Sequence, residues 1–347
     1  MKLRNLIIFL TFIGSSIAFV YHIDAVAFIL STIAIIPLAG LLGKSTEEIS
    51  LYLGPRTGGM LNATLGNAAE LIIGFLLITK GEISIVRASL MGSILSNLLL
   101  VLGASFFFGG VNHKDLSFSA RAASTHVASM TLAVSGLILP SVFSYTSGPT
   151  PSSIGDISIG VGIVLIVIYA SGLFFSLVTH KDAFGELETS STPNWSIKKS
   201  VILLSLTGIL LGWESYILAS TIGNAISRTG LSGFWIGLII LPIAGNAAEH
   251  YSAIMLARRN NADLSLNIAI GSSTQVALVV TPLLVFSGAL LGHPLNLVFS
   301  IFELAALVLA VIIVALITLD GQTDWFEGVQ LLGVYIILVI TSFFITK

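Results

Sequence analysis

A five-residue phrase ending in an acid occurs twice in this sequence, each time inside a long apolar run. It reads Gly66-Asn67-Ala68-Ala69-Glu70 in the first half and Gly245-Asn246-Ala247-Ala248-Glu249 in the second. An ionised carboxylate in the hydrocarbon of a bilayer costs about 2.5 to 3.5 kcal/mol even on lenient insertion scales. Two acids kept at that cost indicate a function for them, and we expect this function to be cation binding.

Other polar residues are spaced so that they could complete such a site. Within each phrase the Asn and the Glu are three residues apart and share a helix face. Two later apolar segments carry polar side chains on one face: Ser93, Ser96 and Asn97 in one, Ser272 and Gln275 in the other. We expect the metal ligands to come from Gly66, Asn67, Glu70, Gly245, Asn246 and Glu249. Hard oxygen ligands with two negative charges suit Ca2+, with Mn2+ as second choice, and are poor for copper or zinc.

Each of these residues could instead have a purely structural role. One isolated phrase could be a helix kink with a capping acid, but its duplication inside apolar runs favours a site. The serines and Asn97 could equally mediate helix packing through small polar side chains. Gln275 is bulkier and costlier to bury, which favours a place in the site.

Further ionisable residues lie in or near the apolar segments. His250 follows Glu249 directly and is about 100° from it around the helix. It is either a buried histidine whose ring nitrogens are hydrogen-bonded or a neighbour of Glu249 that binds a proton. Glu214 and Glu303 lie inside apolar segments and are candidates to line the ion path. Acids near segment ends are expected to be solvated or capping groups, namely Glu47, Glu48 and Glu327.

Composition indicates a polytopic membrane protein. The chain is 55% hydrophobic and 9% charged, whereas about a quarter of the residues of a soluble domain are charged. The net charge of -2 and the absence of a long basic tract argue against nucleic-acid binding. There are no cysteines, which excludes disulfides, thiolate metal sites and cysteine nucleophiles.

The expected fold is an all-α integral membrane protein with eleven transmembrane helices, each apolar run being long enough to cross a bilayer. The segments are 5-20, 24-42, 58-79, 83-109, 120-142, 155-179, 200-221, 232-257, 263-291, 296-319 and 325-346. Lys2, Arg4 and the apolar run after them also resemble a secretory signal peptide. The run resumes at Phe19-Val20 without a clean cleavage site, which favours a retained helix in residues 1-22.

The ten segments after the first divide into two equal halves. The polar stretch 180-199 has the composition of a cytoplasmic linker and separates a first five-helix repeat (23-179) from a second (200-347). The phrases are 179 residues apart, and so are Gly92-Ser93 and Gly271-Ser272. Because five is odd, the second repeat must insert upside down, which brings Glu70 and Glu249 together near the midplane as in secondary transporters.

We also expect both helices to break at the phrase. Gly and Asn are poor helix formers, and Pro242 precedes the second copy by three residues. A broken helix at this depth exposes backbone carbonyls and amide dipoles that can hold an ion.

The distribution of Lys and Arg predicts the orientation. With the N-terminus in the cytoplasm, eleven of these residues lie on the cytoplasmic side and four on the other. The positive-inside rule then places the N-terminus inside and the C-terminus outside.

Several of these motifs resemble those of one family. They are Thr46-Glu47-Glu48, Gly58-Gly59-Met60-Leu61-Asn62-Ala63-Thr64 with the phrase after it, Gly92-Ser93-Ile94-Leu95-Ser96-Asn97-Leu98-Leu99-Leu100, Gly271-Ser272-Ser273-Thr274-Gln275 and Asp324-Trp325-Phe326-Glu327-Gly328. They resemble the cation/proton exchangers, the calcium/proton antiporters of the calcium/cation antiporter superfamily. The resemblance implies an extra first helix and glutamates at positions 70 and 249 that bind Ca2+ and protons in turn. The lack of a long N-terminal extension and of an acidic linker looks more like a prokaryotic plasma-membrane exchanger than a vacuolar one.

The expected function is therefore exchange of Ca2+ for H+ by alternating access, with the first two helices of each half rocking against the rest. The expected partners are the transported ions and the lipid bilayer, with no cofactor, and a homo-oligomer is compatible with the sequence. A sodium/calcium exchanger would share the fold, but it would be expected to carry further acids where Asn97 and Gln275 stand. A channel is disfavoured by the broken-helix repeat, and an intramembrane enzyme by the lack of a nucleophile arrangement or paired aspartates.

Overall fold

The computed structural model describes residues 2–147, 150–175 and 192–345. Most of the predicted linker 180-199 lies outside these residues. The first half contains α1 (Lys2–Val20), α2 (Asp24–Leu65), α3 (Ala68–Thr79), α4 (Ile83–Leu95), the π-helical turn η1 (Ser96–Val101), α5 (Leu102–His113), β1 (Asp115–Ser117), α6 (Ala120–Ser147) and α7 (Pro151–Phe174).

The second half begins with α8 (Ile197–Thr229), α9 (Gly233–Trp235), the π-helical turn η4 (Ile236–Ile240) and α10 (Leu241–Arg258). It continues with α11 (Ala262–Gln275), the π-helical turn η5 (Val276–Val280), α12 (Thr281–Leu290), α13 (Ile301–Ile317), β2 (Gln322–Asp324) and α14 (Trp325–Phe344). β1 and β2 pair antiparallel, with Leu116 opposite Thr323. The described chain is thus almost entirely helical, as predicted from its apolar runs.

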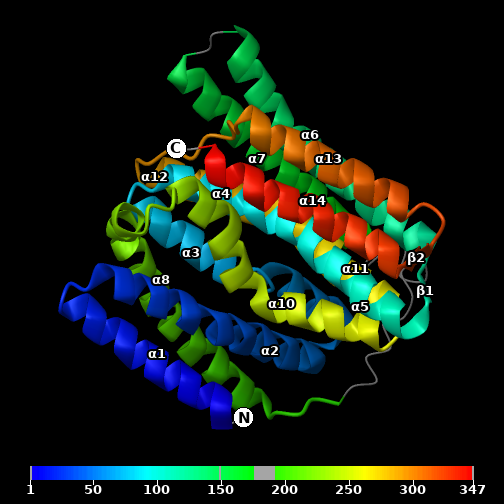
Figure 1. The fold of residues 1–347 in the computed structure, drawn as a ribbon, viewed down its shortest axis with the longest axis horizontal. Coiled ribbons are helices and arrows are strands. Elements are labelled where there is room, and N and C mark those ends of the chain that lie inside the picture. Colours follow the sequence, from blue (N-terminus) through cyan, green and yellow to red (C-terminus); the bar gives the residue numbers. More distant parts are fainter. Residues whose placement is uncertain (1, 148–149, 176–191, 346–347) are drawn as a thin grey trace.

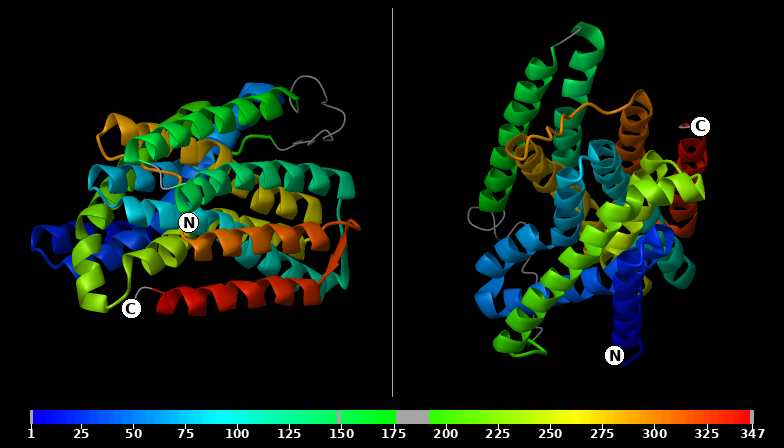
Figure 2. Two further views of the ribbon diagram at one scale, coloured as in Figure 1. Left: turned by 90° about the horizontal axis from the view of Figure 1, so that it is seen from above. Right: turned by 90° about the vertical axis from the view of Figure 1, so that its left-hand side faces the viewer.

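The helices form one bundle in which most long helices run in about the same direction (Figure 2). In Figure 1, α1, α2 and α8 lie on one side of the bundle and α6, α7, α13 and α14 on the other. The shorter elements α3, α4, α10 and α11 lie between them. One large buried apolar cluster extends through α2 to α14, so the residues of both phrases lie on the central elements.

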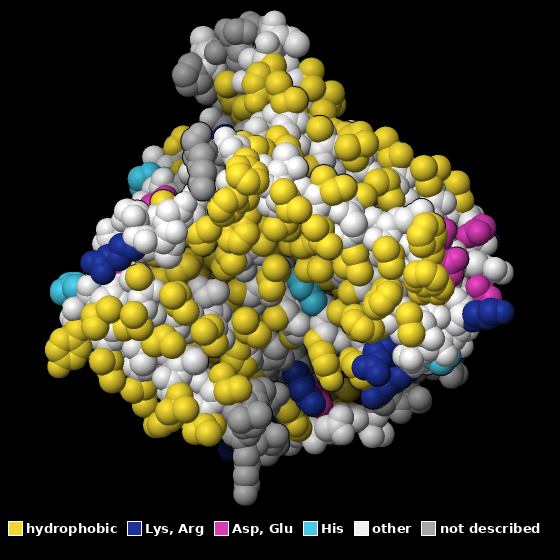
Figure 3. Space-filling model, in the orientation of Figure 1, with side chains coloured by type: hydrophobic (Ala, Val, Ile, Leu, Met, Phe, Trp, Pro, Cys, Tyr) yellow, Lys and Arg dark blue, Asp and Glu magenta, His cyan; other side chains and the backbone are white. Residues whose placement is uncertain are grey.

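The distribution of side chains is that of an integral membrane protein. Seven described helices are long and apolar enough to cross a membrane, and three shorter apolar helices accompany them: Leu6–Val20, Ala68–Thr79 and Ile301–Ile317. Figure 3 shows hydrophobic side chains over the middle of one face, with acidic and basic ones mainly towards its left and right edges and further Lys and Arg low in the view. Several predicted segments are divided between shorter elements, so the count of eleven crossings stays a prediction.

Local structure repeats at the same spacing as the sequence. α4 begins at Ile83 and α11 at Ala262, which are 179 residues apart, and η1 and η5 end at Val101 and Val280, again 179 apart. The turns before α4 and α11 contain Gly81 and Asn260, the residue types that most readily adopt a positive φ, and their φ angles are 76° and 60°. The repetition therefore extends from residue types to backbone conformation.

Several predicted boundaries are wrong, among them the ends of segments 120-142 and 200-221, because α6 continues to Ser147 and α8 to Thr229. Segment 296-319 begins too early, because residues 293–300 are non-helical and α13 starts at Ile301. Segment 24-42 ends too early, because the first part of α2 continues to a kink at Gly54, whose φ of 78° and ψ of 171° are non-helical. The second part of α2 and α3 together correspond to the predicted segment 58-79.

Candidate ion-binding site

Glu70 lies directly after a helix break. Helix α2 ends at Leu65, and α3 begins at Ala68 after Asn67 with a φ of −97° and a ψ of 29°. The predicted break at the first phrase is therefore present. It places the Glu70 carboxylate in the first turn of α3, where the free N–H groups of a helix N-terminus favour an anion.

Glu249 lies instead within a continuous helix. Helix α10 runs from Leu241 to Arg258 through Gly245 and Asn246 without interruption, so the predicted break at the second phrase is wrong. The irregularity lies earlier in the chain, where η4 (Ile236–Ile240) precedes Pro242. Proline has no N–H to donate, so Pro242 cannot bond a carbonyl of η4 one turn earlier.

The two carboxylates lie close together. They interact electrostatically, and a methyl group built on Gly245 would be 3.4 Å from Glu70 Oε1. Glu70 Oε1 and Glu249 Oε2 are buried and have no hydrogen-bond partner among the described residues. Buried polar atoms are nearly always bonded, so these two oxygens are available for a cation or a proton.

The asparagines of the two phrases each reach into the other half. The Asn67 amide donates to Gln275 Oε1 at 2.7 Å, and its Oδ1 accepts a bond from the Ser272 hydroxyl at 3.0 Å. Asn246 donates to the Ser93 hydroxyl at 3.4 Å and to the carbonyl of Pro242 at 3.1 Å. Ser93 and Ser272 occupy the same aligned position, so the two Asn–Ser bonds join equivalent positions, although Asn67 accepts its bond and Asn246 donates its bond.

Ser272 connects most of the polar residues of the site. Its hydroxyl also accepts a bond from Asn97 Nδ2 at 3.1 Å and lies beside the Glu249 carboxylate. Asn97 Oδ1 is in turn 3.1 Å from His250 Nε2. From the sequence, Ser272 was expected either to complete the site or to mediate helix packing, although its alignment with Ser93 already indicated a more central position.

His250 is held as a buried partner of Asn97, with 8% of its surface exposed. Gln275 reaches the site, as its contact with Asn67 shows. Ser96 is fully buried, but its hydroxyl bonds the Ser93 carbonyl of its own helix at 3.2 Å. Ser96 thus belongs to the helix wall beside the site.

Close helix crossings bring the two halves together, and the sequence analysis did not find them. A methyl group on Gly92 would collide with the Leu238 carbonyl and would lie 2.7 Å from Pro242 Cγ. One on Gly237 would lie 2.7 Å from the Ile85 carbonyl. The backbones of α4 and η4 therefore touch, which sets the separation of the elements that carry Ser93 and Asn246.

Two other candidate acids have partners away from this cluster. Glu303 forms a capping box with Ser300, in which its Oε2 accepts from the Ser300 N–H at 2.8 Å and hydroxyl at 2.7 Å. Glu214 is buried on α8, and its Oε1 lies within hydrogen-bond distance of the Ser15 hydroxyl of α1, at 2.8 Å. The structure thus places neither among the polar groups linked to Asn67 and Ser272.

The acids predicted to be solvated or capping differ from one another. Glu47 is exposed. Glu48 is buried, and its Oε2 accepts from the backbone N–H groups of Asn194 and Trp195 at 2.8 and 3.0 Å. Glu327 lies in the first turn of α14 with a buried Oε2. Glu48 thus fastens the described end of the linker region to α2.

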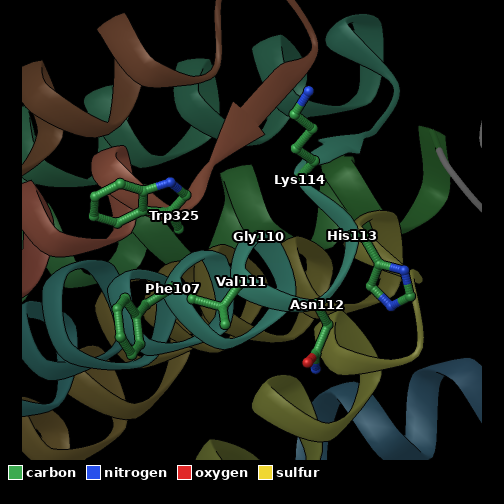
Figure 4. A pocket seen from close by; sticks show the side chains of 7 residues that line it. All are labelled: Phe107, Gly110, Val111, Asn112, His113, Lys114 and Trp325. Carbon is green, nitrogen blue, oxygen red and sulfur yellow. The ribbon is translucent and has the colours of Figure 1, made fainter.

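A hollow of about 950 Å³ lies elsewhere on the surface, at the end of α5 and the start of α14. Figure 4 shows the side chains of Phe107, Val111 and Trp325 on it, with those of His113, the last residue of α5, and Lys114 just after it farther along the chain. Neither phrase contributes to it. Among the described residues no group of three or more His, Cys, Asp and Glu could hold a metal. A cation at the carboxylates would therefore also need amide, hydroxyl or carbonyl oxygens, which Ca2+ accepts.

The fold and the buried polar cluster define a membrane protein built like an ion exchanger, and comparison with known proteins agrees. The family described as "Sodium/calcium exchanger protein" matches residues 23–178 and 199–344. The chain belongs to this family.

Two relatives and one solved structure are similar over almost the whole chain. The Ca(2+)/H(+) antiporter of Aphanothece halophytica is 40% identical, covering 93% of this chain and 91% of the relative. The Ca(2+)/H(+) antiporter ChaA of Bacillus subtilis is 40% identical, covering 92% of each. The structure of native YfkE superposes with a TM-score of 0.87 at 36% identity, covering 98% of this chain and 99% of that one.

Proposed function

We propose that this chain is a secondary active antiporter that exchanges Ca2+ for H+ at one site shared by Glu70 and Glu249. One observation carries the proposal. Two acids from a repeated phrase lie together inside an apolar bundle, and each has a buried oxygen without a partner among the described residues. The names of the similar proteins support the choice of ions.

Charge couples the two fluxes in this proposal. Two ionised carboxylates neutralise one Ca2+, and two protons neutralise the same pair when Ca2+ leaves. The unneutralised pair is costly at this depth, so the site changes sides only when it is loaded. Asn67, Asn246, Ser272 and Gln275 hold the surrounding oxygens in place through the bonds between the halves.

The proposed topology is an extra first helix followed by two inverted five-helix repeats, with eleven crossings and a cytoplasmic N-terminus. Contacts between helix ends support the proposed alternation in direction of successive helices across the membrane. On the side predicted to be cytoplasmic, His113 bonds the Arg258 carbonyl and β1 pairs with β2. On the other side Asn224 bonds Asp24, and Arg87 bonds the Val298 carbonyl.

The packing also supports an alternating-access motion. Helices α2 and α8 are the first helices of the two proposed repeats, and they pack against each other along one side of the bundle (Figure 1). A pair joined in this way can move as a unit against the rest. Such a movement would open the Glu70 and Glu249 site first to one side and then to the other.

Exchange of Na+ for Ca2+ is the second candidate, favoured by the family description. The polar cluster argues for protons, because Asn97 and Gln275 stand where additional acids would serve Na+. Ca2+ uptake should be measured in sealed vesicles under a pH gradient alone and a sodium gradient alone. We expect uptake under the pH gradient, and uptake under sodium alone would favour the second candidate.

Variants test the assignment of the site. Glu70→Gln, Glu249→Gln and the double variant should each lose pH-driven Ca2+ uptake to the same extent, because one missing charge leaves Ca2+ incompletely neutralised. Glu47→Gln, a matched change at an exposed acid of α2, should retain the wild-type rate. Undiminished uptake by folded Glu70→Gln protein would overturn the shared site.

A further inference from the structure

A second buried carboxyl group lies outside the proposed exchange site. Glu214 stands near the middle of α8, about 25 Å along the helix from its start at Ile197, and has no exposed surface. Its Oε1 is 2.8 Å from the hydroxyl of Ser15, a residue of α1 that is also fully buried. Its Oε2 is buried and has no partner among the described residues.

The hydrogen atoms available at this contact favour a protonated Glu214. The Ser15 hydroxyl lies 2.9 Å from the carbonyl of Phe12 as well as 2.8 Å from Glu214 Oε1. A serine hydroxyl has one hydrogen and two acceptor sites, so it cannot fully serve two oxygens as a donor. If Glu214 is protonated, its own O–H donates to Ser15, and Ser15 donates to Phe12. Both short contacts then become hydrogen bonds.

No described side chain forms an ion pair with Glu214. The ammonium group that lies nearby, that of Lys80, stands over the Tyr216 ring, 4.4 Å from its centroid. The described side chains of α1, from Leu6 to Val20, include no ionisable group, and α9 has none. On α2, Asp24 bonds Asn224, about 15 Å along α8 from Glu214. The second half of α2 carries Lys44, Glu47, Glu48, Tyr52 and Arg56, and α3 carries only Glu70. An unpaired carboxylate in such a place is costly.

Helix α1 depends on this region for its attachment to α8. Next to the Ser15 contact, Trp213 Nε1 donates to the Ser16 hydroxyl at 2.9 Å. Towards the other end of α1, the rings of Phe19 and Tyr216 meet edge to face with centroids 6.0 Å apart. Lys80 lies over the Tyr216 ring, 4.4 Å from its centroid. In Figure 1, α1 lies at the edge of the bundle, where it packs most extensively against α2 and less extensively against α8.

We propose that Glu214 is a second proton-binding site, separate from the exchange site, and that its proton locks α1 to α8. Loss of the proton leaves an unpaired negative charge in the apolar interface and takes the Ser15 hydrogen from Phe12. The interface between α1 and α8 then loosens or admits water. The lock is closed at low pH and opens as pH rises.

Infrared spectroscopy of the full-length protein tests the proton directly and does not depend on transport. The Glu70→Gln/Glu249→Gln protein, which lacks the acids of the exchange site, should still show a carbonyl stretch of a protonated carboxylic acid that disappears at high pH. Adding Glu214→Gln should remove that band, and adding Ser15→Ala should shift it. Ser16→Ala, a matched change on the same helix, should leave it in place. A spectrum unaffected by Glu214→Gln at every pH would overturn the proposal.

Cross-linking tests the lock, and the chain has no cysteine of its own to interfere. In a protein with Phe19→Cys and Tyr216→Cys, disulfide yield should fall severalfold at high pH relative to the same pair carrying Glu214→Gln. Comparing the two proteins at the same pH corrects for the general acceleration of thiol oxidation as pH rises. Identical pH profiles with and without Glu214→Gln would show that the proton does not control the interface. These readouts stay valid if Glu70 and Glu249 fail as the exchange site, so the two proposals can fail separately.

Discussion

The two copies of the repeated phrase have the same five residues but different backbones. At the first copy the helix stops at Leu65 and restarts at Ala68, which puts Glu70 at a helix N-terminus. At the second copy α10 is continuous, and Glu249 lies in its interior. A short sequence thus sets which groups are present, whereas its flanks and packing set whether the helix breaks.

The difference changes what surrounds each carboxylate. Glu70 has free backbone N–H groups beside it, and these stabilise negative charge. Glu249 has the Ser272 hydroxyl and, one residue further on, the buried His250. The position aligned with His250 in the first half is Leu71. The proposed exchange site is therefore chemically unequal on its two sides, although the two phrases that share it are identical.

Aligned glycines give the largest expected difference between the halves. A methyl group on Gly92 would collide with the Leu238 backbone, whereas one on Gly271 meets no atom within 4 Å. Gly92→Ala should destabilise the protein by about 1 to 3 kcal/mol or more through overpacking. Gly271→Ala should be neutral or stabilising by up to about 1 kcal/mol, because Ala is the better helix former. Thermal unfolding in detergent measures both, and equal shifts would contradict the close crossing of α4 and η4.

Removing the asparagine amides should affect the first copy more than the second. Asn67 makes two bonds to α11, and Asn246 makes one weaker bond to Ser93 and one within its own helix. Each bond contributes about 0.5 to 1.5 kcal/mol. Asn67→Ala should therefore weaken the apparent Ca2+ affinity by about 10-fold and Asn246→Ala by about 3-fold. The initial exchange rate measured against Ca2+ concentration gives both apparent affinities. The reverse order would show that Asn246 contributes more to Ca2+ binding than Asn67 does.

Replacing His250 by its counterpart in the first half should have a moderate effect. His250→Leu removes the partner of Asn97 Oδ1, which costs about 1 kcal/mol. We expect exchange to persist with about a 5-fold lower rate. The reciprocal change Leu71→His serves as the control for side-chain size. Complete loss of exchange in correctly folded His250→Leu protein would instead make His250 a proton carrier in the cycle.

The π-helical turn η5 should give the smallest effect. The Thr281 hydroxyl bonds the Val276 carbonyl five residues earlier, at 2.9 Å, whereas the aligned position after η1 is Leu102. Because η1 has no such hydroxyl, Thr281→Val should cost no more than about 1 kcal/mol of stability and leave the exchange rate within about 2-fold. A much larger loss of rate, measured in vesicles, would show that η5 needs this bond in order to place Gln275.

Sequence patterns predicted the pairing of the two acids better than they predicted the bounds of the elements. Glu70 and Glu249 were brought together by one argument, that an exact repeat of five segments must be inverted, and the structure places their carboxylates close to each other. Glu303 shows the opposite case. Its apolar surroundings suggested the ion path, but Ser300 three residues earlier makes it a capping box, a signal that was readable in the sequence.

By itself the sequence determined the membrane class, the repeat at 179 residues and the set of oxygen-bearing residues that are candidates for the site. These follow from composition and spacing, which act locally along the chain. Only the tertiary structure decided that the first phrase breaks its helix and the second does not, that Ser272 joins Asn67 to Asn97, and that Glu214 faces Ser15. Those contacts join residues more than 170 positions apart, and which side chains meet at such separations depends on how the helices pack.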